Sequence, residues 1–144
     1  MLPDPISKLS MRTKDVYDIF HGGAIPGFSP IRSTFVDVRD VAELVVKGVE
    51  QDLARTESAK PGEERYLLVG NSEPVSPQQM ADVLREKYPE RRDTIQEGIP
   101  GKTYPEMTYK FTSSKAKGLL GREWIGFKQS VLDSVDAFQK LEKR

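Results

Sequence analysis

The segment that most constrains the fold is residues 34–50, TFVDVRDVAELVVKGVE, because its apolar pattern changes period within a few positions. Apolar residues alternate up to Val38, as in a half-buried strand, and then recur at spacings of three and four, as in a helix. The helical stripe consists of Val38, Val41, Ala42, Val45, Val46 and Val49. A strand over residues 34–38 that leads directly into an amphipathic helix is therefore predicted.

Three charged residues stand at this change of period: Asp37, Arg39 and Asp40. Asp40 is placed to cap the helix, with its side chain accepting a backbone N–H of the first turn. Asp37 and Asp40 could alternatively form a carboxylate pair for acid–base or metal chemistry. Arg39 could form a local ion pair or hold an anion at the helix start. We favour an architectural role for the segment, with Asp37 and Arg39 used in packing and hydrogen bonding.

Four further helices and two further short strands are expected. The helices fall over residues 11–20, within 76–89, over 113–120 and over 127–141, and the strands are RYLLVG (65–70) and TYKFT (108–112). The helix after Ser76 has a capping-box sequence, with Pro77 at its first position and Gln79 two residues later. The expected architecture is a single α/β domain over residues 1–144, with at least four helices and few short strands.

Composition excludes several classes of function. Lys plus Arg and Asp plus Glu each number 22, so the formal net charge is zero and no electrostatic footprint for nucleic acid exists. The absence of cysteine excludes disulfides and thiolate catalysis and fits a reducing compartment. No apolar run reaches the roughly 18 residues of a membrane span, and the start of the chain does not have the pattern of a signal peptide. A cytoplasmic protein that binds neither nucleic acid nor membrane is expected.

Candidate catalytic residues are few. His21 is the only histidine, and a lone histidine in a loop is more often a surface residue than a catalytic one. The glycines at 22, 23 and 27 do not follow a strand and open a helix, as a phosphate-binding loop would. A hydrolase that uses His21 is therefore a weakly supported hypothesis, and no metal site is expected.

Three blocks of sequence, in order, resemble the C-terminal half of extended short-chain dehydrogenases/reductases of the NAD-dependent epimerase/dehydratase superfamily. They are FVDVRDVAELVVKGVE, ERYLLVGNSEPVSPQQMADVLREKYP and YKFTSSKAKGLLGREWIGFKQSVLDSVDAF, and the opening LPDPISKLSMRTKDVYDIFHG is also similar. The likeness is to the dihydroflavonol reductase-like branch, which includes fungal NADPH-dependent aldehyde and ketone reductases. The resemblance covers nearly the whole chain.

The resemblance implies a Rossmann-type subunit in which an N-terminal part binds NAD(P)H and a C-terminal part closes over the substrate. This chain resembles the C-terminal part, so the dinucleotide-binding part is absent from it. The family uses a glycine-rich turn and a Tyr-x-x-x-Lys pair, and the sequence has neither. The residues four positions after the five tyrosines are His21, Gly70, Arg92, Thr108 and Ser113. No catalytic or cofactor-binding residue can be carried over, and no cofactor is expected to bind this chain alone.

The first function hypothesis is therefore the substrate-binding part of an NAD(P)H-dependent oxidoreductase that acts on a carbonyl or hydroxyl group and is inactive alone. The alternative is a non-catalytic module that binds a partner or a ligand. Substrate contacts are predicted at Tyr17, Phe20, Phe28 and Tyr104, because bulky apolar side chains suit a hydrophobic carbonyl pocket. A partner chain that covers an exposed sheet edge beside residues 34–38 is also expected.

Overall fold

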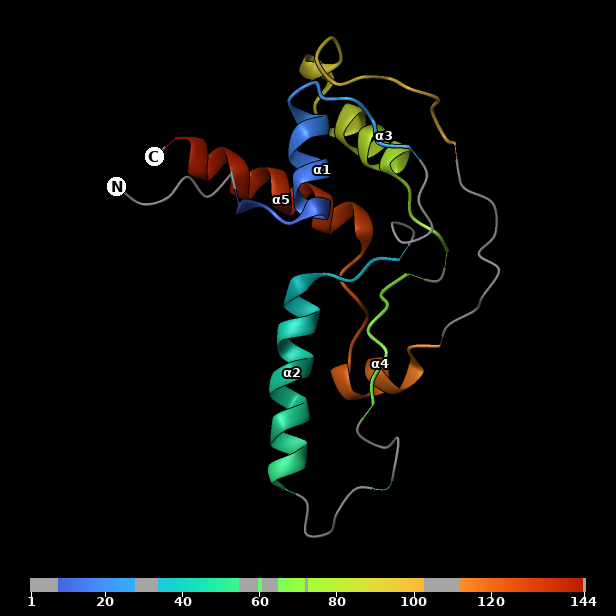
Figure 1. Ribbon diagram of the computed structural model, residues 1–144, viewed down its shortest axis with the longest axis vertical. Helices are drawn as coiled ribbons and strands as arrows, with labels where there is room; N and C mark the ends of the chain where they lie inside the picture. Colours follow the sequence, from blue (N-terminus) through green and yellow to red (C-terminus); the bar gives the residue numbers. More distant parts are fainter. Residues whose placement is uncertain are drawn as a thin grey trace.

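The computed structural model describes residues 8–27, 34–54, 60, 65–71, 73–102 and 112–143. Within these residues the chain forms five α-helices, a short 3-10 helix after α3, and no strand (Figure 1). The elements are α1 (Met11–Phe20), α2 (Val38–Leu53), α3 (Pro77–Lys87), η3 (Pro89–Arg91), α4 (Ser114–Leu120) and α5 (Phe127–Glu142). None of the helices in the described part is long and apolar enough to cross a membrane.

Helices α1, α3 and α5 pack against one another at one end of the molecule and enclose the larger core (Figure 1). This three-helix core contains Val16, Ile19, Phe20, Met80, Ala81, Leu84, Ile95, Val131, Val135 and Phe138. All of them except Ile95 recur at helical spacing on the three helices, so burial of these stripes accounts for the packing of the helices. The predictions of helices at 11–20 and 127–141 are confirmed, the second ending one residue later than expected.

The start of α3 and the end of α4 follow the sequence signals closely. The Ser76 hydroxyl accepts the Gln79 N–H at 3.0 Å, and the Gln79 side chain accepts the Ser76 N–H at 2.7 Å, which completes the predicted capping box. Gly121 ends α4 with a φ of 75°, the left-handed conformation that favours glycine.

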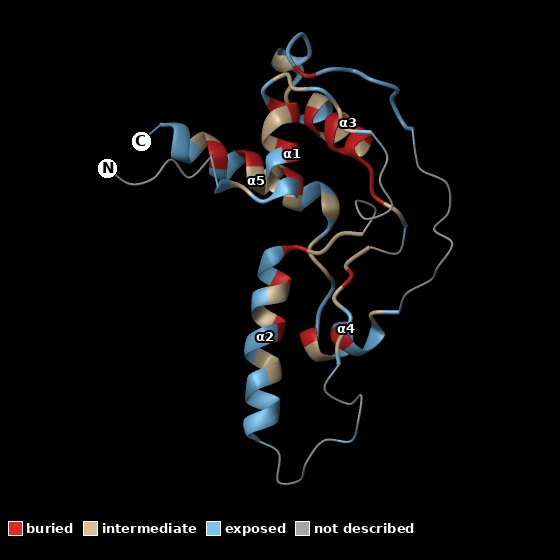
Figure 2. Cartoon of the chain, viewed as in Figure 1, coloured by how far each residue is buried: buried red, intermediate tan, exposed pale blue. Residues whose placement is uncertain are grey.

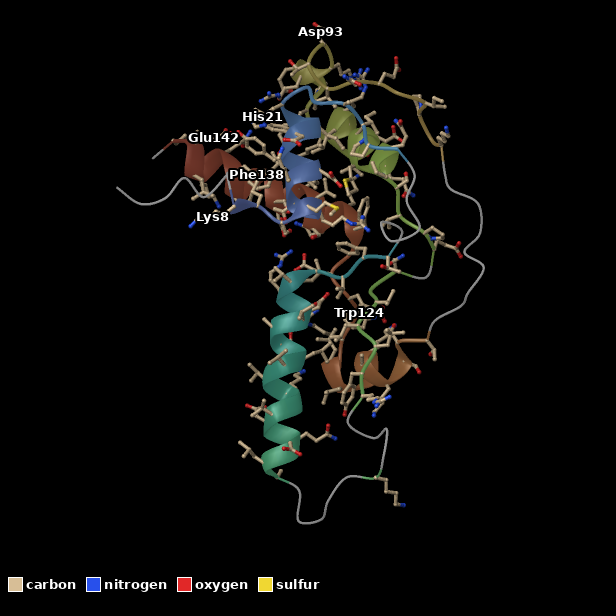
Figure 3. The ribbon with its side chains drawn as sticks, viewed as in Figure 1. Lys8, His21, Asp93, Trp124, Phe138 and Glu142 are labelled. Carbon is tan, nitrogen blue, oxygen red and sulfur yellow. The ribbon has the colours of Figure 1, made fainter. Side chains whose placement is uncertain are left out.

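Helices α2 and α4 form a second, smaller packing unit at the other end of the molecule (Figure 1). Its two-helix core consists of Leu44, Ala116 and Leu120, with Tyr66, Leu68, Leu119 and Trp124 packed against it. Trp124 lies between α2 and α4 (Figure 3). The segment 65–70 therefore contributes side chains to this core although it forms no helix.

The predicted strands over 34–38 and 65–70 are not formed, and this prediction is wrong for the described residues. Residues 34–37 and 65–70 run without helical turns, Val38 is already the first residue of α2, and one backbone hydrogen bond joins the two segments, from the Gly70 N–H to the Phe35 carbonyl at 2.7 Å. A ladder needs successive residues paired on both chains, and one bond does not make one. Most of the predicted strand 108–112 lies outside the described residues.

Helix α2 begins earlier than predicted and exposes the stripe that the sequence suggested. Asp37, not Asp40, is the N-cap, and its carboxylate accepts the Arg39 N–H at 2.9 Å. The large apolar side chains of the outer face are 54% to 81% exposed, and Figure 2 shows that face mostly as exposed. They are Val38, Val45, Val46, Val49 and Leu53. The opposite face, which includes Leu44, packs against α4.

Candidate functional site

A cavity of about 530 Å³ lies where α1, α5 and residues 34–41 meet. Its apolar lining includes Val16, Phe35, Val36, Val38, Val41, Met80, Phe127 and Val131, and its polar lining includes Ser10, Arg12, Thr13, Thr34, Ser130 and Ser134. This volume and a mainly apolar lining with a few polar groups are typical of sites for small organic molecules. We take this α1–α5 cavity as the candidate site.

Phe35 forms one wall of the cavity and is held on three sides. Its N–H donates to the Asn71 side-chain oxygen at 2.6 Å, and its carbonyl accepts the Gly70 N–H at 2.7 Å. Its ring contacts the Phe127 ring edge to face, with 5.3 Å between centroids. Residues 70–71 and the start of α5 therefore fix the position of this wall.

Ion pairs of Arg39 link the start of α2 to α5. Arg39 donates to both oxygens of Asp37 at 2.9 Å, and a third guanidinium nitrogen lies 2.7 Å from the Asp133 carboxylate on α5. The hydrogen bonds from Arg39, assisted by one from Ser130, lower the pKa of Asp37 to about 2. The pKa of the Arg39 guanidinium is raised by its bonds to Asp37 and Asp133. Asp37 is therefore a buried structural anion and not a proton carrier near neutral pH.

Asp40 has a separate set of partners. Its carboxylate is fully buried, accepts the Ile125 N–H at 2.9 Å and lies 2.8 Å from the Arg122 guanidinium. Arg122 also binds Glu43 at 2.6 Å, and Glu43 and then Asp40 raise its pKa. Because Asp37 and Asp40 bind different groups, they do not act as a carboxylate pair. Among the described residues no group of acidic or histidine side chains is arranged to hold a metal ion.

Of the four predicted substrate contacts, two lie within the described residues and two lie outside them. Phe20 has no exposed surface and lies in the three-helix core, with the Arg91 guanidinium 4.0 Å above its ring centroid. Tyr17 stacks on His21 with 4.2 Å between centroids and meets Phe138 edge to face. Neither residue lines the α1–α5 cavity. Phe28 and Tyr104 lie outside the described residues.

His21 connects the end of α1 to the end of α5. One ring nitrogen lies 3.1 Å from the Glu142 carboxylate and the other 3.0 Å from the Tyr17 carbonyl (Figure 3). Both nitrogens thus face acceptors, at the end of α1 and the end of α5. These contacts give His21 a structural role and do not support the hydrolase hypothesis.

The cavity is equipped to bind a molecule rather than to transfer a proton. Arg12 is its one ionisable lining residue, and its guanidinium donates to the Thr34 carbonyl at 3.4 Å. Sequence reasoning did not identify Arg12, Asn71, Ser130 or Ser134. The available signal was the pair of serines four residues apart beside the apolar stripe of α5, which places both hydroxyls on one helix face. Ser134 donates to the Ser130 carbonyl at 2.8 Å.

Known proteins resemble the chain in both sequence and fold, although no protein-family model matches it. A Candida albicans protein named as an NADPH-dependent methylglyoxal reductase, GRP2, is 26% identical over 131 residues, which are 90% of this chain and 36% of that protein. The structure of a reductase engineered for asymmetric catalysis is 27% identical, with a TM-score of 0.66, over 90% of this chain and 36% of the other.

The yeast methylglyoxal/isovaleraldehyde reductase Gre2, solved with NADPH, has a TM-score of 0.66 at 23% identity, over 94% of this chain and 44% of its own. The chain thus spans about two fifths of the length of these relatives. These findings confirm the resemblance inferred from sequence: the chain is homologous to the Gre2/GRP2 NADPH-dependent reductases and corresponds to a C-terminal part of such an extended reductase.

Proposed function

We propose that this chain is the substrate-binding part of an NADPH-dependent reductase that acts on a small carbonyl compound. The observation that carries the proposal is the similarity to the methylglyoxal reductase over 90% of this chain. The apolar α1–α5 cavity supplies a volume suited to such a compound. Its serines and threonines offer hydrogen bonds that would orient a carbonyl oxygen. Such an enzyme would work in the cytoplasm.

The residues of this chain do not fit a dinucleotide. The sequence has no glycine-rich turn after a strand, and one cationic side chain, Arg12, lines the cavity. NADPH would therefore bind to residues outside this chain, and the chain by itself would be inactive. Its contribution is to enclose the substrate and exclude water.

The substrate contacts in this proposal come from two sources. The cavity offers Ser134 and Phe35, which line it from α5 and from residues 34–36. Tyr17, Phe20, Phe28 and Tyr104 stay predicted contacts. For Phe20, full burial means that its effect on a substrate would pass through the packing of α1.

The decisive experiment is a chimera in which this chain replaces the matching 131 residues of the Candida albicans reductase. We expect the chimera to oxidise NADPH in the presence of methylglyoxal or another small aldehyde or ketone. A folded chimera that binds NADPH but reduces none of a panel of such compounds would disprove the proposal.

A matched pair of substitutions in the chimera tests the cavity itself. Ser134→Leu fills space in the lining and should raise KM for the carbonyl compound more than it lowers kcat. Ala137→Leu adds the same bulk at an exposed position of the same helix and should leave both parameters unchanged.

A non-catalytic binding module is the second candidate, favoured by the missing glycine-rich turn and Tyr-x-x-x-Lys pair. In that case the isolated chain would bind a partner or an apolar ligand, while the chimera would bind NADPH without turnover. Binding measurements on the isolated chain and turnover measurements on the chimera therefore separate the two candidate functions.

A further inference from the structure

Among the described residues that line the α1–α5 cavity, Arg12 alone is ionisable. Its side chain stands in the first turn of α1, is half-buried and donates to the Thr34 carbonyl at 3.4 Å. A guanidinium stays protonated at every pH at which a protein is folded and carries five N–H donors in a planar fork. The cavity therefore has a permanent positive charge in a lining that is otherwise neutral and mainly apolar.

The hydroxyl groups of the cavity differ between its two sides. On the α5 side, Ser134 donates its one proton to the Ser130 carbonyl at 2.8 Å, and Ser130 donates its own to Asp37. Both hydroxyl oxygens are therefore left with lone pairs and no proton for a ligand. On the α1 side, the Ser10 and Thr13 hydroxyls lie 2.9 Å apart, and one of their two protons is used between them. The donors that a ligand can use thus gather on the α1 side, where Arg12 lies.

This arrangement favours a ligand with a carboxylate on the α1 side. A guanidinium binds a carboxylate through two parallel N–H···O bonds, and such charge-assisted bonds are about twice as strong as neutral ones. The lone pairs of the α5 serines would repel the same carboxylate oxygens, so one orientation of the ligand is preferred. A doubly charged phosphate suits the cavity less, because a single cation would leave part of its charge uncompensated among apolar side chains.

We propose that the carbonyl compound that this cavity takes is an oxo acid, with its carboxylate bound by Arg12. The proposal rests on the proposed function for the reaction and adds the class of substrate. The apolar lining, which includes Val16, Phe35 and Val131, would hold the carbon chain that carries the ketone.

The carboxylate of such a substrate is unchanged in the reaction. The ketone carbon gains a hydride from NADPH held by the complementary part of the reductase, and the ketone oxygen gains a proton from solution. The products are a hydroxy acid and NADP⁺. The compounds in the names of the relatives, methylglyoxal and isovaleraldehyde, are uncharged, so a preference for an acid would distinguish this chain from them.

Acetoacetate and acetoacetamide are a matched pair of substrates for the test, because they share one shape and one ketone and differ by one charge. The measured quantity is the ratio of kcat/KM for acetoacetate to kcat/KM for acetoacetamide in the chimera with the Candida albicans reductase. We expect Arg12→Gln to lower this ratio at least about tenfold, because the charge-assisted bonds are lost while one donor stays. Most of the fall should come from a higher KM for acetoacetate.

Two further variants separate a direct contact from a general effect of charge. Arg12→Lys keeps the positive charge without the planar fork and should recover part of the ratio. Lys14→Met is the matched control, since Lys14 is also a cation on α1 but is exposed and pairs with Asp18 at 2.6 Å. It should leave the ratio unchanged. Turnover of acetoacetamide by each variant reports that the variant is folded.

The outcomes distinguish this proposal from the proposed function. Equal ratios in the unsubstituted chimera and in Arg12→Gln would overturn the oxo-acid assignment and leave the reductase function intact. A folded chimera that reduces neither compound would refute the function, and binding to the isolated 144-residue chain would then decide the assignment. Acetoacetate should shift the amide NMR signals of Thr34 and Phe35 at concentrations at which acetoacetamide does not. Equal shifts with both compounds, or none with either, would overturn it.

Discussion

The buried carboxylate of Asp40 accepts the backbone N–H of Ile125 at 2.9 Å, although the two residues are 85 positions apart. The same carboxylate lies 2.8 Å from the guanidinium of Arg122. Asp40 thus fixes the chain between α4 and α5 against the first turn of α2.

Asp40→Ala should therefore lower the free energy of unfolding by roughly 1–3 kcal/mol, because it leaves the partly buried Ile125 N–H without its acceptor. Asp40→Asn keeps an acceptor oxygen and should recover part of the loss. Glu43→Ala removes the other carboxylate that binds Arg122, and because the Glu43 side chain is 35% exposed this change should have a much smaller effect. Urea denaturation of the three variants measures the differences, and equal effects of Asp40→Ala and Glu43→Ala would contradict this role.

Asp37 should make stability depend on pH in the acid range. Arg39 lowers the pKa of this carboxyl from its ordinary 3.8 to about 2, so the folded chain favours the ionised form. The resulting stabilisation is fully present above about pH 4 and is lost as the pH falls through about 2. The Asp37→Asn variant cannot ionise, so its stability gap to the natural chain should be widest at neutral pH and should close near pH 2. Denaturant midpoints at several pH values measure the gap, and a gap independent of pH would refute the assignment.

The helices show which features the sequence predicts and which it does not. The capping box at Ser76 was predicted correctly because all of its atoms lie within four residues, and the α5 stripe because its period is local. Asp37 and Asp40 both suit a cap by residue type, and the choice between them depends on Ile125 and Arg122, which are distant in sequence. Local patterns contain no information on such partners.

The sequence did not predict that the valine stripe of α2 is exposed, for a related reason. Its spacing identified an amphipathic helix correctly, but periodicity does not say what covers the apolar face. The expected strands at 34–38 and 65–70 likewise have suitable residues and lack a ladder in the described part. The cavity was missed because its lining comes from α1, α3, α5 and residues 34–41, whose meeting depends on tertiary packing.

Gly98 should tolerate alanine much less well than Gly101. Both glycines have a positive φ, 61° and 71°, so alanine brings a similar backbone strain of roughly 1–2 kcal/mol at each. At Gly98 an added Cβ would also meet the Gln78 side-chain oxygen, which accepts the Ile99 N–H at 3.0 Å, whereas nothing lies near Gly101. Gly98→Ala should therefore lower the melting temperature clearly more than Gly101→Ala does. Equal shifts in thermal unfolding would show that the Gln78 contact does not constrain this loop.

NADPH should produce no saturable change in the fluorescence of Trp124 when it is added to the isolated chain. Trp124 is the only tryptophan and packs on the two-helix core, so it reports on binding near α2 and on any change in that core. The physical reason for the expectation is that dinucleotide phosphates need several backbone N–H groups of a glycine-rich turn or several cations, and the α1–α5 cavity offers Arg12 alone.

Free N-acetyltryptophanamide at matched absorbance corrects for the light that NADPH itself absorbs. In the chimera the same titration should saturate, because the complementary part then supplies the cofactor site. A stoichiometric response of the isolated chain would place a cofactor site within these 144 residues and would overturn the proposal that NADPH binds to residues outside this chain.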